Sequence, residues 1–143
     1  LLYGTLTDLR YYSNVEDTFH TFDSGLHCLA NTTDDLSNYR KDRSSKLLEQ
    51  YVDEETGELD LDELTAVMQD KELSESLENY PKELDYDMAK NNTSIFIQGD
   101  EFGTVGTTVI FFDKNGKIQA REVKYSQKGI TEVTTKEQNV QLQ

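Results

Sequence analysis

The side chains with the widest chemical range in this sequence are one thiol, Cys28, and two imidazoles, His20 and His27. A thiolate can act as a nucleophile, and histidines can bind metal ions or haem iron. His27 and Cys28 are neighbours on a strand predicted at residues 25–30, so they point to opposite faces and cannot act on each other. Cys28 lies among apolar residues and is predicted to be a buried, unreactive thiol. Neither histidine belongs to a metal-binding motif, so both are predicted to be packing or surface residues.

The acidic stretch 52–63 resembles a calcium loop in its spacing. Gly57, Leu59 and Glu63 fall at the sixth, eighth and twelfth positions of such a loop. The first position, which is normally an aspartate ligand, is Val52. We therefore predict a solvated turn with acidic helix caps, no metal site and no resident cofactor.

A ligand could approach the backbone closely where small residues follow one another on a strand. Gly103, Thr104 and Thr107 form such a run, and we predict that they contribute to ligand binding. They belong to the stretch 99–125, the most regular part of the sequence, around which the other elements are organised.

This stretch predicts a β-hairpin of two long strands. Asn115-Gly116 is typical of a type I′ turn, and residues 117–125 alternate between apolar and polar. Residues 109–112 form a continuous apolar run, which predicts a strand covered on both faces.

The remaining elements predict an α+β fold with antiparallel sheets and helices on one face. Apolar residues at helical spacing favour one helix that begins at Ser37 or Asn38 and a second capped by Asp60 or Asp62. The other predictions are a hairpin over 1–12 with its turn near Thr7-Asp8, a loop over 13–24, strands at 25–30 and 91–98, and a strand or tail at 130–142.

Composition limits the partners of this chain. Its 143 residues suffice for one domain, and a net charge of −14 argues against nucleic acid and against an anionic membrane surface. No apolar run reaches 18 residues, so no transmembrane segment is predicted. The single cysteine excludes an internal disulfide and fits a reducing compartment. The first residues already have the pattern of a strand, so we expect a preceding part of the chain.

Four stretches carry a family resemblance in their order and separation. The sequence 102–110 (FGTVGTTVI), followed by Asp113-Lys114-Asn115-Gly116, resembles the Tyr-Gly-Thr-Arg-Thr-Asn-Thr strand and Asp-X-Asp-Gly turn of the transport and Golgi organisation protein 2 family, also called the NRDE family. The resemblance extends back through residues 94–97 and 25–31 to the first residue. Val105 replaces the family's usual Arg, and Ser37-Asn38 replaces a Pro-Trp pair, which indicates a divergent member.

The resemblance implies the αββα sandwich of the N-terminal-nucleophile hydrolases. Residues 1–143 would then be a single unit, the C-terminal half of a larger αββα domain. The nucleophilic Cys would lie in the N-terminal half, since Leu1 has no nucleophilic atom. By the same resemblance, the amide of Asn31 could donate to the oxyanion. Alternatively, Asn31 closes a turn through its own backbone hydrogen bonds.

Three functions follow as expectations. The resemblance implies an intracellular, cytoplasmic protein, associated with Golgi, endoplasmic reticulum or mitochondria, that handles haem or acyl-CoA and lipid metabolites and affects Golgi organisation. Haem would be a carried ligand. The alternative is an amide hydrolase of the N-terminal-nucleophile type, whose nucleophilic Cys would lie in the preceding N-terminal half and whose oxyanion Asn31 would stabilise. A third possibility is an interaction module that uses the acidic face of residues 53–87.

Overall fold

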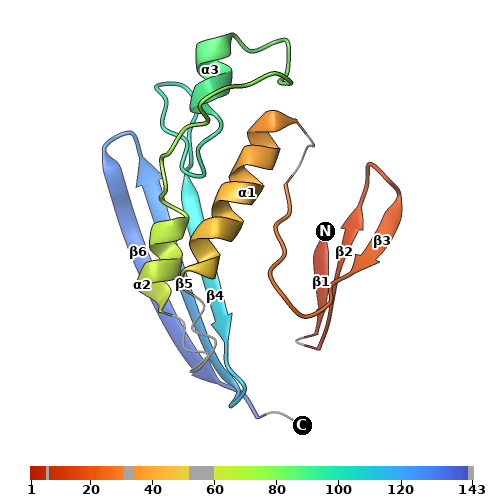
Figure 1. Cartoon of the computed structure of the whole chain (residues 1–143). Helices are drawn as coiled ribbons and strands as arrows, with labels where there is room; N and C mark the ends of the chain where they lie inside the picture. Colours follow the sequence, from red (N-terminus) through yellow and green to blue (C-terminus); the bar gives the residue numbers. More distant parts are fainter. Residues whose placement is uncertain (6, 31–33, 52–59, 142–143) are drawn as a thin grey trace.

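The residues that the structure describes form two antiparallel sheets and three helices, which confirms the α+β class. The computed structural model describes residues 1–5, 7–30, 34–51 and 60–141. The N-terminal sheet has the order β1-β2-β3, and the C-terminal sheet has the order β4-β5-β6. Figure 1 shows the two sheets apart from each other, with α1 between them and α2 over the C-terminal sheet. The elements are β1 (Leu2–Thr5), β2 (Asp8–Ser13), β3 (Thr18–Thr21), α1 (Asp35–Glu49), α2 (Leu61–Val67), α3 (Tyr86–Asn91), β4 (Gly106–Phe112), β5 (Lys117–Ser126) and β6 (Gly129–Asn139).

The predicted hairpin is present as β4 and β5, but its turn differs from the prediction. A type I′ turn needs positive φ at both central residues, whereas among the described residues other than glycine only Asp17 has positive φ. The turn instead runs over residues 113–116, with the Gly116 N–H donating to the Asp113 carbonyl at 3.2 Å. Gly116 has a φ of 84°. The Asp113 carboxylate completes the turn by accepting from the N–H groups of Asn115 and Lys117.

One face of β4 is open, so the prediction that residues 109–112 are covered on both faces is wrong. Thr107 is 6% exposed and lies beside buried Val123 on the inner face, which α2 covers. On the outer face, Ile110 is 55% and Phe112 is 44% exposed. The apolar run reflects a strand whose outer face lacks a covering layer within the described chain.

The helices begin at aspartate caps. The Asp34 carboxylate accepts from the Ser37 N–H and caps α1, three residues before the predicted Ser37. Asp60 caps α2 as predicted. Two small cores lie around these elements: Leu36, Leu77 and Ala89 form one, and Phe96, Val123 and Tyr125 form the other.

The structure confirms two of the other predicted elements and contradicts three. The first hairpin is confirmed, with Thr5 opposite Asp8, and β6 confirms the strand at the C-terminal end. The loop over 13–24 is wrong because residues 18–21 pair with β2 as β3. Residues 25–30 form no strand, and residues 91–98 contain the end of α3 followed by turns. In residues 91–98, the Thr93 hydroxyl donates to the Lys90 carbonyl and the Ser94 hydroxyl donates to the Phe96 carbonyl. These local hydrogen bonds take the place of pairing with a neighbouring strand.

Candidate functional site

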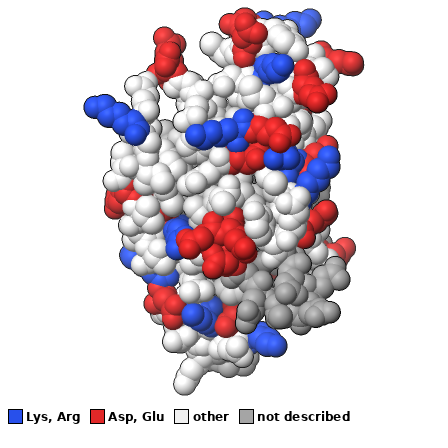
Figure 2. Space-filling view, turned by 60° about the vertical axis from the view of Figure 1, so that its left-hand side comes forward, with Lys and Arg blue, Asp and Glu red and all other residues white. Residues whose placement is uncertain are grey.

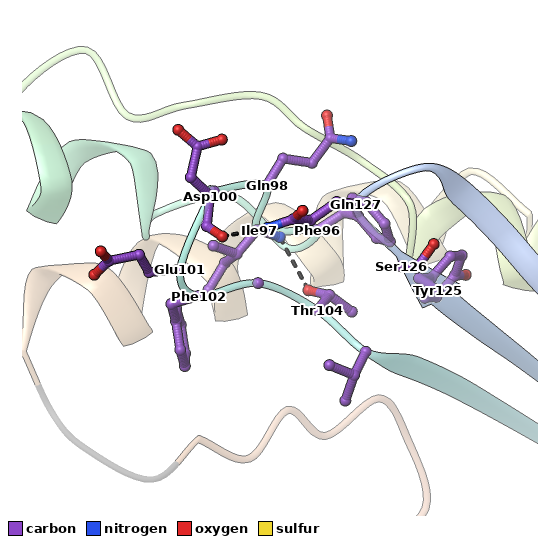
Figure 3. Close-up of a pocket in the computed structure, with 13 residues that line it drawn as sticks. Phe96, Ile97, Gln98, Asp100, Glu101, Phe102, Thr104, Tyr125, Ser126 and Gln127 are labelled. Atoms are coloured by element: carbon purple, nitrogen blue, oxygen red, sulfur yellow. Dashed lines mark hydrogen bonds between the residues drawn. The ribbon is translucent and has the colours of Figure 1, made fainter.

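A hollow between two loops contains part of the predicted ligand-binding run. This loop hollow has a volume of about 450 Å³ and is lined by residues 96–105 and 125–127. Figure 3 shows the lining residues of both loops, with Phe96 and Tyr125 among them. The rings of these two residues meet edge to face with centroids 4.7 Å apart, which joins the two loops at this part of the lining.

Gly103 and Thr104 line this hollow and also close its loop. The Thr104 N–H donates to the Ile97 carbonyl at 2.9 Å, and the Ile97 N–H donates to Thr104 Oγ1 at 3.0 Å. A Cβ atom on Gly103 would lie 3.0 Å from the Ile97 carbonyl oxygen. The third predicted residue, Thr107, lies outside the hollow, buried on the sheet. The small side chains are therefore explained by loop closure, and ligand binding by them stays a prediction.

The mouth of the loop hollow is acidic. Asp100 and Glu101 are exposed there, and Figure 3 shows the two carboxylates pointing away from the hollow. The Gln127 amide donates to the Asp100 carbonyl. With a net charge of −14 on the chain, this hollow does not favour an anionic ligand.

A larger and more apolar hollow lies beside the N-terminal sheet. This N-terminal groove has a volume of about 770 Å³. Strand register explains one wall: Leu2 lies opposite Tyr11, and Leu9 is two residues from Tyr11, so the leucines share one face of the sheet. The segment after β3 forms the other wall. The lining residues are Leu2, Thr7, Leu9, Phe22, Asp23, Ser24, Gly25, Leu26, His27 and Leu29.

An aromatic row supports the groove. The rings of Tyr11 and His20 stack at 4.4 Å, Tyr11 and Phe22 lie 5.4 Å apart, and Phe22 and His27 lie 4.8 Å apart. Both imidazoles already have a partner: His27 Nε2 lies 2.8 Å from the Asp23 carbonyl oxygen, and His20 Nε2 lies 2.8 Å from Glu16 Oε2. These contacts orient the rings as part of the wall.

The sequence did not indicate this groove, because its residues come from distant segments with no shared motif. One signal was available: Leu2, Leu9 and Tyr11 have the spacing that places apolar side chains on one face of a hairpin. Phe22, Leu26 and Leu29 become neighbours of that face only through the path of the chain after β3.

The other predicted chemical groups are dispersed. Cys28 is half-buried, and its thiol lies 3.3 Å from the Ser45 hydroxyl of α1. Asn31, the predicted oxyanion donor, and the first part of the possible calcium loop lie outside the described residues. Within the described ranges, no group of three or more His, Cys, Asp or Glu side chains is arranged to hold a metal ion.

The surface charge is mixed on the face that Figure 2 shows. Figure 2 shows acidic and basic side chains interspersed on one face, in place of a continuous acidic surface. An example is Arg43 of α1, which pairs with Asp70 and Glu72 from the acidic stretch. None of the helices in the described part of the chain is long and apolar enough to cross a membrane.

Comparison with known proteins identifies the family. Neither the curated proteins nor the solved structures gave a significant match. The family model described as "Transport and Golgi organisation 2" matches residues 1–127, which is most of the chain. The four stretches that resemble this family in sequence all lie within the matched range. The chain therefore belongs to the transport and Golgi organisation 2 family.

Proposed function

We propose that the protein handles an acyl-lipid metabolite and holds its hydrocarbon chain in the N-terminal groove. The observation that supports this proposal is the groove itself, in which five apolar side chains line about 770 Å³. Ligand sites commonly have volumes of about 300–1,000 Å³ and mainly apolar walls. Membership of the transport and Golgi organisation 2 family gives the cellular setting, which we propose to be intracellular and related to Golgi organisation.

The chemistry of the groove favours an acyl chain over haem. The His27 Nε2 atom, which could bind haem iron, already pairs with the Asp23 carbonyl, so iron binding would first break a hydrogen bond. Asp23 is the charged residue among the lining side chains, and it would repel haem propionates. The same repulsion applies to the phosphates of CoA, so we place the acyl chain, and not the CoA head, in the groove.

Titration with a fluorescent long-chain fatty acid tests the proposal. The variant Leu26→Asp puts a charge on the groove wall at an exposed position, where the fold tolerates it. We expect it to weaken binding by about tenfold or more, because the chain would have to desolvate a carboxylate. Val15→Asp is the matched control, since Val15 is exposed and lies outside the groove. It should bind as the wild type does.

Two outcomes would overturn the acyl-lipid proposal. One is equal binding by wild type and Leu26→Asp. The other is absence of fatty-acid binding together with saturable haem binding whose absorbance band is lost in His27→Ala. The hydrolase alternative has its own test in the full-length protein, which would supply the nucleophilic Cys: release of product from an amide or thioester, abolished in Asn31→Ala, would support catalysis.

A further inference from the structure

The turn between β4 and β5 contains the most reactive asparagine sequence of the chain. Asn115 is the one asparagine in the sequence that a glycine follows. Asparagine is a labile residue, and it is most labile before glycine, because no side chain hinders the glycine backbone nitrogen. That nitrogen can attack the side-chain amide carbon: the new C–N bond closes a succinimide ring, and the amide nitrogen leaves as ammonia. Water then opens the ring at either carbonyl and leaves aspartate or isoaspartate.

Asp113 holds three backbone N–H groups around the bond that would rearrange. Its Oδ1 atom accepts from the N–H groups of Asn115 and Lys117 at 2.7 and 2.8 Å. Its carbonyl oxygen accepts from the N–H of Gly116, the attacking nitrogen, at 3.2 Å. Ring closure requires that this nitrogen lose its proton and that the peptide unit between Asn115 and Gly116 rotate. The hydrogen bonds to Asp113 oppose both requirements.

Burial differs on the two sides of this peptide bond. Asn115 is exposed, so water reaches its side-chain amide, whereas Gly116 is buried. The asparagine side chain is therefore not shielded by the fold, and its protection depends on the hydrogen-bonded turn. Asn14 is also exposed in a turn, but Val15 follows it, and the branched side chain of valine hinders the attack.

We propose that Asn115 is a site of spontaneous deamidation and that Asp113 protects it in the folded protein. Conversion proceeds from the open turn, so its rate follows the fraction of molecules in which these hydrogen bonds are broken. Isoaspartate lengthens the backbone of the turn by one carbon, and both products add a negative charge. Because turn length fixes the register of a hairpin, isoaspartate disturbs the pairing of Phe112 with Ile118. The modification is therefore a permanent change that weakens the β4–β5 hairpin.

Peptide mapping by mass spectrometry tests the proposal on protein incubated at mildly alkaline pH. We expect Asn115 in the folded wild type to convert slowly, and at least about tenfold faster in urea, where the turn is lost. Asp113→Ala should accelerate conversion in the folded protein by about tenfold, because it removes two hydrogen bonds to a charged acceptor. Asp113→Asn retains an oxygen that accepts, so its rate should lie between the two. Asn14 is the internal reference, and its rate should be the same in all folded variants.

Val123→Ala is the matched control for a general loss of stability. Val123 is 2% exposed, so its truncation weakens the packing of the same hairpin and leaves the hydrogen bonds of the turn in place. It should change the rate at Asn115 far less than Asp113→Ala does. Equal acceleration by these two variants, or a folded wild type that converts as fast as it does in urea, would overturn the proposal. If circular dichroism shows that Asp113→Ala is unfolded, Asp113→Asn decides, and a rate equal to that of the wild type would overturn the role of Asp113.

Discussion

At the scale of single residues, the pair Arg43–Asp70 connects α1 to the segment after α2. Arg43 Nε donates to Asp70 Oδ1 at 3.1 Å, and Nη2 donates to Oδ2 at 2.8 Å. The side chains are 24% and 18% exposed, so solvent screens them only in part. The guanidinium lowers the pKa of the Asp70 carboxyl below its ordinary value. A two-pronged, half-buried pair of this kind contributes more than an exposed one.

We predict that Asp70→Asn lowers the free energy of unfolding by about 1–2 kcal/mol at pH 7, because it removes charge-assisted hydrogen bonds. Urea unfolding measures this change. Asp8→Asn is the control: Asp8 also pairs with Arg10 through two hydrogen bonds, but both side chains are about half exposed, so stability should barely change. Equal losses of stability in the two variants would contradict the inference that the half-buried pair contributes more than the exposed one.

The effect of Asp70→Asn should depend on pH. Because the pKa of Asp70 is lower in the folded than in the unfolded state, its contribution is present above the ordinary pKa of an aspartate and is lost as the pH falls below about 4. The wild type and the variant should therefore converge in stability in acid. If the difference in stability between the wild type and Asp70→Asn stayed the same in acid, the Arg43–Asp70 pair would not be its cause.

At the scale of elements, the β4–β5 hairpin depends on its turn. Gly116 has a φ of 84°, a backbone conformation in which an L side chain crowds the carbonyl. Asp113 holds the turn with its carboxylate, which accepts from Asn115 and Lys117 at 2.7 and 2.8 Å. The N–H bonds to the carboxylate lower the pKa of Asp113. The two residues together set the register of β4 against β5.

Replacement of Gly116 should therefore reduce the stability of the fold. We predict that Gly116→Ala lowers the free energy of unfolding by about 1–2 kcal/mol, and that Gly116→Asn costs less because Asn tolerates positive φ. Thermal unfolding followed by circular dichroism measures both. Gly106→Ala serves as control, since its Cβ would lie 3.6 Å from the Val123 carbonyl oxygen, an ordinary contact. If Gly106→Ala were the more harmful change, the turn would not be the sensitive point.

At the scale of the whole molecule, burial is uneven between the two sheets. No residue of β1, β2 or β3 is buried in the described part of these strands, whereas β4 and β5 bury Thr107, Val123 and Tyr125. The N-terminal sheet is held by its ladder and by exposed aromatic contacts such as Tyr12–Phe19. Local opening requires less free energy where few apolar contacts must be broken.

We predict that backbone amides of β1–β3 exchange with deuterium faster than those of β5, because the N-terminal sheet opens locally without global unfolding. Hydrogen exchange followed by mass spectrometry measures this. Addition of the fatty acid should slow exchange in β1, β2 and the segment 22–29 if the groove is occupied, and should leave β5 unchanged. Equal protection of the two sheets in the free protein would contradict the uneven distribution of stability.

The sequence by itself determined the elements whose signals are local. Alternation over residues 117–125, the acidic cap at Asp60 and a turn that ends at Gly116 follow from side-chain period and from backbone preferences of single residues. The four stretches that resemble the family are also each local in sequence, and the family match covers them. These features need no knowledge of distant partners.

Only the tertiary structure decided the remaining strands and the sites, because a strand is stabilised by hydrogen bonds to a neighbouring strand. Residues 18–21 form β3 because they pair with β2. Residues 91–98 contain stronger β-formers but pair with no strand among the described residues, and they form turns instead. Thr107 is buried and Thr104 closes a loop, although both belong to one small-residue run. The N-terminal groove likewise depends on contacts between distant segments, which local preference does not encode.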